Sequence, residues 1–244
     1  MLSIESLLNH ANLPESPTPR LDAELLLAHA LGKSRSYLHT WPERELPAEL
    51  IATFEACVAR RRSGEPVAYI LGRQGFWSLE LDVANHTLIP RPDTELLVET
   101  ALALLPTTPL AVLDLGTGSG AIALALACER PVWQVVGVDR VPEAVALASG
   151  NRERLQLNNA VFAESHWFAA LAGQRFALIV SNPPYIAAAD PHLSQGDVRF
   201  EPSSALVAGI DGLDDIRQII QQAPEHLNAA GWLLLEHGFD QAEA

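Results

Sequence analysis

The chain has 244 residues and a mass of 26.4 kDa, enough for one large domain or two modest ones. With 48% hydrophobic and 19% charged residues, the composition is typical of a globular protein and excludes a disordered chain or a collagen-like repeat. The net charge of -14 disfavours binding to a phosphate backbone, and the two cysteines have neither zinc-site nor disulfide-framework spacing. Because the sequence shows no membrane-spanning apolar run and no secretory leader, we expect a cytoplasmic protein.

Helical patterns fill the first part of the chain. Ser3 is placed to cap a first short helix, and Gly32 to end a second. A further helix begins at Pro47 and ends at the arginines 60–62, which we interpret as a solvated helix end favoured by the helix dipole. These patterns predict a helical N-terminal domain over residues 1–70.

Residues 66–90 change to a strand-like pattern. Apolar residues recur from Val67 to Val83 and are interrupted by glycines. We therefore expect short strands here, forming a β-hairpin linker over residues 71–92.

From residue 93 onward, after one helix that ends at Leu105, predicted strands alternate with helices. The strands cover residues 111–115, 132–138, 160–163, 176–180 and 232–236. The helices between them cover residues 121–129, 142–157 and 214–227. This alternation predicts an α/β fold with a parallel sheet that is covered on both faces.

Three candidate ligand-binding segments lie at the ends of predicted strands. They are residues 114–120 (DLGTGSG), Asp139, and residues 182–185 (NPPY). Ligands of open parallel sheets bind beyond the carboxyl ends of the strands, where the strand order reverses. Glycines let the first segment approach a ligand closely at a helix N-terminus, and a carboxylate such as Asp139 can accept both hydroxyls of a ribose.

The first two segments alone leave two classes of protein open, an NAD-dependent dehydrogenase and a methyltransferase. Two details favour the methyltransferase. The glycines follow G-x-G-x-G instead of the dinucleotide pattern G-x-G-x-x-G. Asp114, directly before the turn, suits the sulfonium and ammonium groups of S-adenosylmethionine better than the phosphates of NAD.

The NPPY segment is the most specific of the three. Its two prolines stiffen a turn that has no N–H donors. The side-chain carbonyl of Asn182 and the backbone carbonyl of Pro183 can hold the two hydrogens of a planar NH2 group, on which Tyr185 can stack. We recognise no strong base beside this motif and interpret His237 as structural, so the sequence predicts catalysis by positioning, with Asn182, Pro183 and Tyr185 as catalytic residues.

Several motifs together resemble the HemK/PrmC-type glutamine N5-methyltransferases of peptide-chain release factors, over nearly the whole chain. The motifs are DLGTGSG, VDR, SNPPYI, residues 91–95 (RPDTE), residues 199–202 (RFEP) and residues 235–238 (LEHG). The resemblance implies a Rossmann-like class I methyltransferase domain over residues 93–244 that uses S-adenosylmethionine and releases S-adenosylhomocysteine. Its acceptor is the glutamine of the Gly-Gly-Gln motif of release factors.

The resemblance also implies which residues form the sites. The implied cofactor site consists of Asp114, Gly116, Thr117, Gly118, Ser119, Gly120, Asp139, Trp167 and Asn182. The implied glutamine site consists of Asn182, Pro183, Pro184 and Tyr185, without a metal. Trp167 packs near the adenine, and the N-terminal helices dock on the release factor. We expect a monomer that contacts neither nucleic acid nor membrane.

Two alternatives share these motifs, and two features depart from the family pattern. A glutamine methyltransferase of a ribosomal protein has the same catalytic motifs, and NPPY also occurs in adenine-N6 nucleic-acid methyltransferases. His166 stands where family members often have an acid directly before the tryptophan. Folds of this type also continue with a helix and an antiparallel hairpin after the fifth strand, so we expect a truncated C-terminus.

Overall fold

The structure is a computed structural model that describes residues 2–243, which form two compact units. One unit contains the described residues up to Gly72 together with His192–Phe200, and the other contains Arg73–Pro191 and the residues from Glu201 onward. The segment His192–Phe200 thus belongs with the N-terminal helices, although the chain reaches it only after the fourth strand of the parallel sheet. Among the described residues, no helix is both long and apolar enough to cross a membrane.

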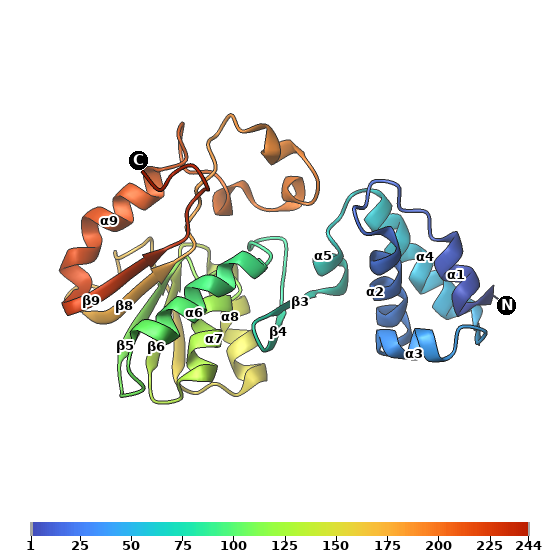
Figure 1. Ribbon diagram of the computed structural model, residues 1–244, viewed down its shortest axis with the longest axis horizontal. Helices are drawn as coiled ribbons and strands as arrows, with labels where there is room; N and C mark the ends of the chain where they lie inside the picture. Colours follow the sequence, from blue (N-terminus) through green and yellow to red (C-terminus); the bar gives the residue numbers. More distant parts are fainter. Residues whose placement is uncertain (1, 244) are drawn as a thin grey trace. The chain divides into compact units, whose positions relative to one another are not determined.

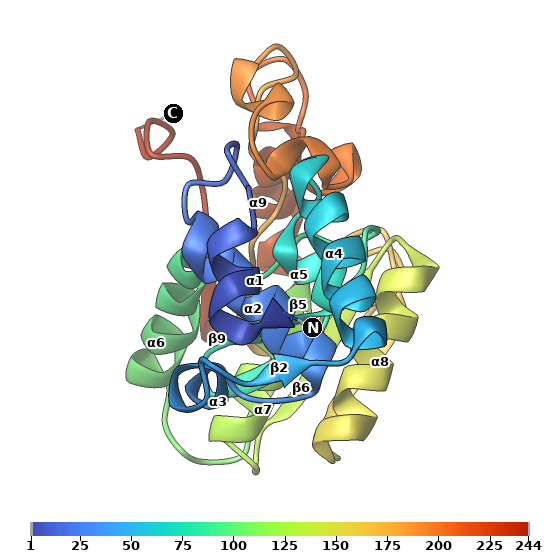
Figure 2. The same cartoon turned by 90° about the vertical axis from the view of Figure 1, so that its right-hand side faces the viewer.

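The N-terminal unit is helical, and Figure 2 looks onto its helices. It contains α1 (Ile4–His10), α2 (Pro19–Leu31), α3 (Arg35–Thr40), α4 (Ala48–Arg62), α5 (Val67–Leu71) and the antiparallel pair β1 (Leu2–Ser3) and β2 (Glu45–Leu46). Ser3 caps α1 as predicted, since its side chain accepts a hydrogen bond from the Ser6 N–H. The strand predicted from Val67 is wrong: α5 starts after Pro66 and ends at Gly72, whose φ of 70° is left-handed.

Arg61, at the end of α4, corrects a second prediction. Its side chain is 6% exposed, whereas the sequence pattern predicted a solvated helix end. Its Nε donates to Asp22 Oδ2 at 2.7 Å and its Nη1 to Asp197 Oδ1 at 2.8 Å. Two carboxylates therefore offset the cost of burying one guanidinium, and the Asp197 bond holds the returning segment His192–Phe200 on the helices.

The second unit confirms the predicted α/β fold. A hairpin of β3 (Arg73–Phe76) and β4 (Leu79–Asp82) precedes η1 (Pro92–Thr94) and α6 (Glu95–Leu104). The sheet consists of β5 (Ala111–Leu115), β6 (Gln134–Asp139), β7 (Ala160–Glu164), β8 (Phe176–Ser181) and β9 (Leu227–Leu235). Its helices are α7 (Ala121–Glu129), α8 (Pro142–Leu155) and α9 (Asp214–His226), with the short 3-10 helix η4 (Ser203–Ala205). The 3-10 helix η3 (Val198–Phe200) and all but the first residue of η2 (Pro191–Ser194) belong to the returning segment His192–Phe200 of the N-terminal unit. β9 begins five residues before its predicted start.

Helices cover both faces of the sheet (Figure 1). On one face, side chains such as Val112 and Val180 pack in a core with α6 and α7. On the other face, Leu113 and Ile179 pack in a core with α9. Successive residues of a strand point to opposite faces, so β5 and β8, which are buried on both, read as continuous apolar runs.

The strands are all parallel and lie in the order β7-β6-β5-β8-β9. The order reverses beside β5, because the chain moves outward to β6 and β7 and then returns to β8 and β9. Pairing at the carboxyl edge aligns one residue of each of the four strands β6, β5, β8 and β9: Val138, Leu115, Ser181 and Leu235. The next residues of the four segments, Asp139, Gly116, Asn182 and Glu236, thus leave the sheet at the same level.

Candidate functional site

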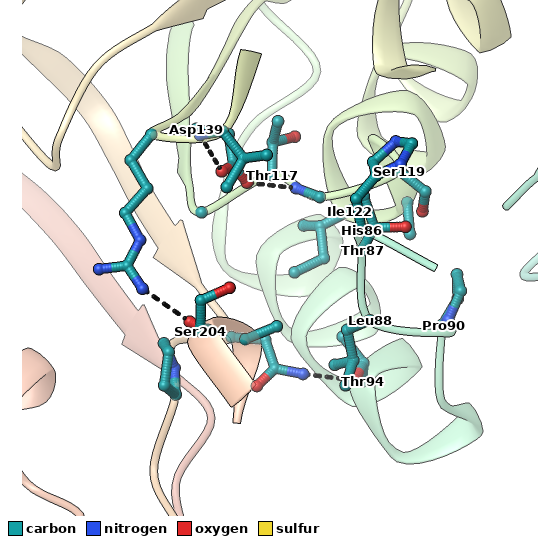
Figure 3. A pocket seen from close by; sticks show the side chains of 18 of the residues that line it. His86, Thr87, Leu88, Pro90, Thr94, Thr117, Ser119, Ile122, Asp139 and Ser204 are labelled. Carbon is teal, nitrogen blue, oxygen red and sulfur yellow. Dashed lines mark hydrogen bonds between the residues drawn. The ribbon is translucent and has the colours of Figure 1, made fainter. Parts of the chain in front are cut away.

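A cavity lies at this carboxyl edge, where the strand order reverses. Asp139 and Ser204 lie on one side of it, and His86, Thr87 and Leu88 lie on the other (Figure 3). The part of the chain that the structure describes has no cluster of three or more His, Cys, Asp or Glu side chains that could hold a metal ion.

Most of the residues that the sequence singled out line this cavity. They are Gly116, Thr117, Gly118, Ser119, Asp139, Trp167, Asn182 and Pro184. Four others do not belong to its lining: Asp114, Gly120, Pro183 and Tyr185. Segments 88 positions apart in sequence, around Thr94 and Asn182, meet here.

The glycine turn after β5 bends sharply around the cavity. Gly116, Gly118 and Gly120 have φ values of 68°, 56° and 86°, a left-handed conformation that glycine adopts without steric cost. A Cβ atom at Gly116 would lie 3.4 Å from the Trp167 ring, in van der Waals contact with it, so the backbone of the turn lies close to the indole. The Gly118 N–H points at the end of β6, where it donates to Asp139 Oδ2 at 2.9 Å.

Both carboxylate oxygens of Asp139 accept hydrogen bonds from backbone N–H groups. Oδ2 accepts from Gly118 N–H, and Oδ1 accepts from Val141 N–H at 3.0 Å. The side chain therefore ties the glycine turn to the start of α8 while it lines the cavity. Each carboxylate oxygen has a further lone pair, so these bonds leave acceptor capacity toward a ligand.

Asp114 lies beneath the turn and is 1% exposed. Its Oδ2 accepts from the Thr117 hydroxyl at 2.6 Å and from Ala123 N–H at 3.2 Å, so it fastens the turn to α7. Its Oδ1 has no hydrogen-bond partner among the described residues. Burial raises the pKa of this carboxyl to about 7. The hydrogen bonds from Thr117 and Ala123 lower the pKa, and the Asp139 charge raises it by a smaller amount. The interaction with a cation that the sequence suggested stays a prediction.

The Asn182 side chain is held by a residue from another segment. Its Nδ2 donates to Thr94 Oγ1 at 3.0 Å, a bond drawn as a dashed line in Figure 3. Thr94 is 5% exposed and ends η1, directly before α6. Because Nδ2 donates to Thr94, the carbonyl oxygen Oδ1 of Asn182 is available to accept a hydrogen bond.

Tyr185 lies beside an acid that sequence analysis did not connect with the motif. Its hydroxyl donates to Glu236 Oε1 at 3.1 Å. Burial, and secondly the Glu236 carboxylate, raise the pKa of Tyr185 to about 12, so the phenol stays protonated as a donor. The sequence alone indicated no strong base beside NPPY. The carboxylate now found there belongs to the LEHG motif, which the resemblance included without a role.

The sequence also did not indicate the wall of the cavity that lies opposite the sheet. Residues 86–88 with Pro90 and Thr94 line the cavity before α6, and Ser204 and Ala205 line it from η4. The RPDTE motif, which contains Thr94 of this wall, contributed to the family resemblance, but the sequence assigned it no role in the site. Nothing in the pattern indicated that it faces the NPPY segment.

Fold and site define a methyltransferase with a Rossmann-like domain, and the family matches agree. Residues 92–198 match the family described as Methyltransferase small domain, and residues 4–72 match the one described as PrmC N-terminal domain. Among solved structures, the chain is similar to the Thermus thermophilus 16S rRNA N2 G1207 methyltransferase, with 26% identity and a TM-score of 0.49 over 67% of this chain and 40% of that chain.

Curated relatives define the particular family. The chain is 68% identical to the release factor glutamine methyltransferase of Pseudomonas aeruginosa, over 100% of this chain and 88% of that protein. It is 54% identical to the protein of the same name from Escherichia coli strain K12, over 96% of this chain and 84% of the relative. The chain belongs to the family of release factor glutamine methyltransferases.

Proposed function

We propose that this protein transfers a methyl group from S-adenosylmethionine to the side-chain amide nitrogen, N5, of the glutamine in the Gly-Gly-Gln motif of peptide-chain release factors. The observation that carries this proposal is the pairing of the glycine turn with Asn182 in one cavity. The turn suits the cofactor, and Asn182 suits an amide. The shared name of relatives at 68% and 54% identity supports the release factor as the acceptor.

The residues of the cavity fit S-adenosylmethionine. Gly116 and the Trp167 ring both line the cavity, and a side chain larger than a methyl group at position 116 would meet the ring. Asp139 offers acceptor oxygens to the ribose hydroxyls, and the backbone of residues 116–119 lines the methionine end. When bound, the cofactor supplies an electrophilic methyl group on a sulfonium sulfur.

The acceptor amide is bound by carbonyl oxygens. Asn182 Oδ1 and the Pro183 carbonyl accept the two hydrogens of the glutamine NH2 group, and neither proline nitrogen offers a competing donor. Pro184 and Tyr185 complete the glutamine site, with the Tyr185 ring stacked on the planar amide. Two acceptors at this place select an amide over a carboxylate, since a glutamate side chain has no hydrogen to donate when ionised.

Catalysis consists mainly of positioning. An amide nitrogen is a weak nucleophile because its lone pair is delocalised into the carbonyl group. Asn182 and Pro183 fix the direction of that nitrogen, which lowers the entropic part of the barrier, and they disfavour its planar resonance form. The N–C bond forms as the sulfur–methyl bond breaks, S-adenosylhomocysteine leaves as a neutral thioether, and the nitrogen loses one proton to solvent during or after transfer.

The N-terminal helices form the docking domain for the release factor in this proposal. We keep the division into residues 1–70 for docking, 71–92 for the hairpin linker and 93–244 for catalysis. The match of residues 4–72 to the PrmC N-terminal domain supports a family-specific role for these helices. The charge of -14 favours a protein acceptor over nucleic acid, and we propose a monomer that acts in the cytoplasm.

The test is methyl transfer from labelled S-adenosylmethionine to purified release factor, followed by peptide mass spectrometry. We expect one methyl group on the Gly-Gly-Gln glutamine and none with the Asn182→Ala variant. Ribosomal proteins are assayed in parallel, because methylation there alone would transfer the proposal to the other glutamine substrate. Methylation of neither, with cofactor bound normally, would refute the proposed acceptor.

A further inference from the structure

Tyr185 is held at both of its ends by the segment that follows β9. Its hydroxyl donates to Glu236 Oε1 at 3.1 Å, from a residue 51 positions away. Its backbone carbonyl accepts from Gln241 Nε2 at 3.0 Å, from a residue 56 positions away. Both contacts come from outside NPPY, so the position of the ring depends on a segment that the motif does not contain.

The sheet register places Glu236 beside NPPY. The Glu236 N–H donates to the Ser181 carbonyl at 3.0 Å, which extends the β8–β9 ladder by one residue. Glu236 therefore leaves the sheet at the level of Asn182. Its second oxygen, Oε2, is buried and has no hydrogen-bond partner among the described residues. A buried carboxylate oxygen without a partner costs stability, which makes Glu236 a candidate for a functional role.

Gln241 is itself oriented for this contact. Its Oε1 accepts from the Gly238 N–H at 2.8 Å, which leaves Nε2 as the atom that faces the Tyr185 carbonyl. Gly212 packs on the same carbonyl: a Cβ atom there would lie 2.3 Å from it, and its φ of 78° favours glycine. The backbone of Tyr185 is thus fixed by one donor and one close contact.

We propose that Glu236 and Gln241 are positioning residues for methyl transfer and act through Tyr185. This inference rests on the proposed function, in which the Tyr185 ring stacks on the acceptor amide. Glu236 fixes the far end of the ring and Gln241 fixes its backbone end. A ring held at both ends keeps the amide plane in one orientation, and small losses of alignment lower the rate strongly.

The experiment compares Glu236→Leu, Glu236→Gln, Tyr185→Phe and the double variant Tyr185→Phe/Glu236→Leu. Glu236→Leu and Tyr185→Phe each lower kcat on release factor by about 10- to 100-fold. Glu236→Gln retains most activity, because its side-chain carbonyl still accepts from the phenol. The double variant is no slower than the slower single variant, since both changes remove one hydrogen bond. Cofactor affinity, measured by calorimetry, stays at the wild-type value, because neither side chain lines the cavity.

Gln241→Leu provides a second test that leaves the buried carboxylate in place. It lowers kcat at unchanged cofactor affinity, whereas Gln221→Leu, a matched change at an exposed position of α9, leaves kcat unchanged. This test also applies if Glu236→Leu fails to fold.

The outcomes separate this inference from the proposed function. A wild-type protein that methylates no glutamine refutes the proposed function. An active wild type in which Glu236→Leu and Gln241→Leu both keep full kcat overturns the positioning role alone. The positioning role is also overturned if the Tyr185 and Glu236 substitutions act independently and their fold-losses multiply, or if Glu236→Gln is as slow as Glu236→Leu.

Discussion

At the glycine-turn end of the cavity, the contacts join residues that are close in sequence. The Thr117 hydroxyl bonds Asp114 three positions away, and Gly118 bonds Asp139 at a separation of 21. At the NPPY end, Asn182 bonds Thr94 at a separation of 88, and Tyr185 bonds Glu236 at a separation of 51. One end of the cavity is built by a single strand-helix-strand unit, and the other is assembled from three distant segments.

This difference indicates how the two ends respond to change. The glycine-turn end is fixed by backbone N–H groups and one hydroxyl that bond carboxylates, so its shape follows from local chain geometry. The NPPY end is fixed by side chains, and removal of one distant hydroxyl or carboxylate frees Asn182 or Tyr185, which we propose to bind the acceptor amide. We therefore expect substitutions to separate into effects on cofactor affinity and effects on kcat.

Asn182→Ala gives the largest expected effect. It removes an acceptor of the substrate amide, so kcat falls by about 100-fold or more. The dissociation constant of S-adenosylmethionine, measured by calorimetry, changes little. Asn158→Ala, at an exposed position in the turn before β7, is the matched control and keeps wild-type kcat. A variant that loses cofactor affinity in proportion to kcat would contradict the separation.

Asp139→Ala has the opposite signature. The glycine turn loses the partner of Gly118, α8 loses the partner of Val141, and the ribose loses its acceptor. We expect cofactor affinity to weaken by about tenfold, which corresponds to ~1.4 kcal/mol. At saturating cofactor kcat recovers most of its wild-type value. An unchanged affinity with a low kcat would show that Asp139 acts on the acceptor.

Thr94→Val tests the hydrogen bond at the NPPY end that joins the residues farthest apart in sequence. Valine has the shape of threonine but cannot accept the hydrogen bond from Asn182 Nδ2. A lost neutral hydrogen bond is worth about 1 kcal/mol, so we expect kcat to fall about fivefold at unchanged cofactor affinity. Thr94→Ser restores the hydroxyl and most of the rate. If valine and serine behave alike in steady-state kinetics, the hydroxyl does not position Asn182.

Asp114→Asn has the smallest expected effect on kcat and instead changes the stability of the protein. The pKa of Asp114 is raised to about 7 in the folded protein, above its ordinary value of 3.8, so the folded state binds more protons between these values. The wild-type protein therefore loses stability as the pH rises from about 4 to 7, because Asp114 ionises less readily in the folded state. A neutral asparagine at this position does not have this loss. The Tm of the variant relative to wild type rises over this range, by about 2–4 °C per kcal/mol. Scanning calorimetry that finds a constant difference would exclude a raised pKa.

Much of the site was readable from motifs because they lie next to buried strands. The five strands of the sheet were predicted, and the residues 116–119, Asp139, Trp167 and Asn182 line one cavity. Two predictions were wrong, one because of a distant partner and the other because of the residues that flank a short helix. Arg61 looked like a solvated helix end, but Asp197 comes back to it from 136 positions away. The segment from Val67 looked strand-like, but Pro66 and Gly72 set a helical turn.

The sequence by itself determined the fold class and the glycine turn, because each depends on residues within a few positions of one strand, and it predicted the NPPY acceptors from the motif alone. Tertiary structure alone decided which side chains hold those acceptors. Thr94 and Glu236 reach Asn182 and Tyr185 only through the strand order β7-β6-β5-β8-β9 and its register. Hydrogen bonds between residues 51 and 88 positions apart leave no period or spacing in a single sequence, so only the folded chain shows them.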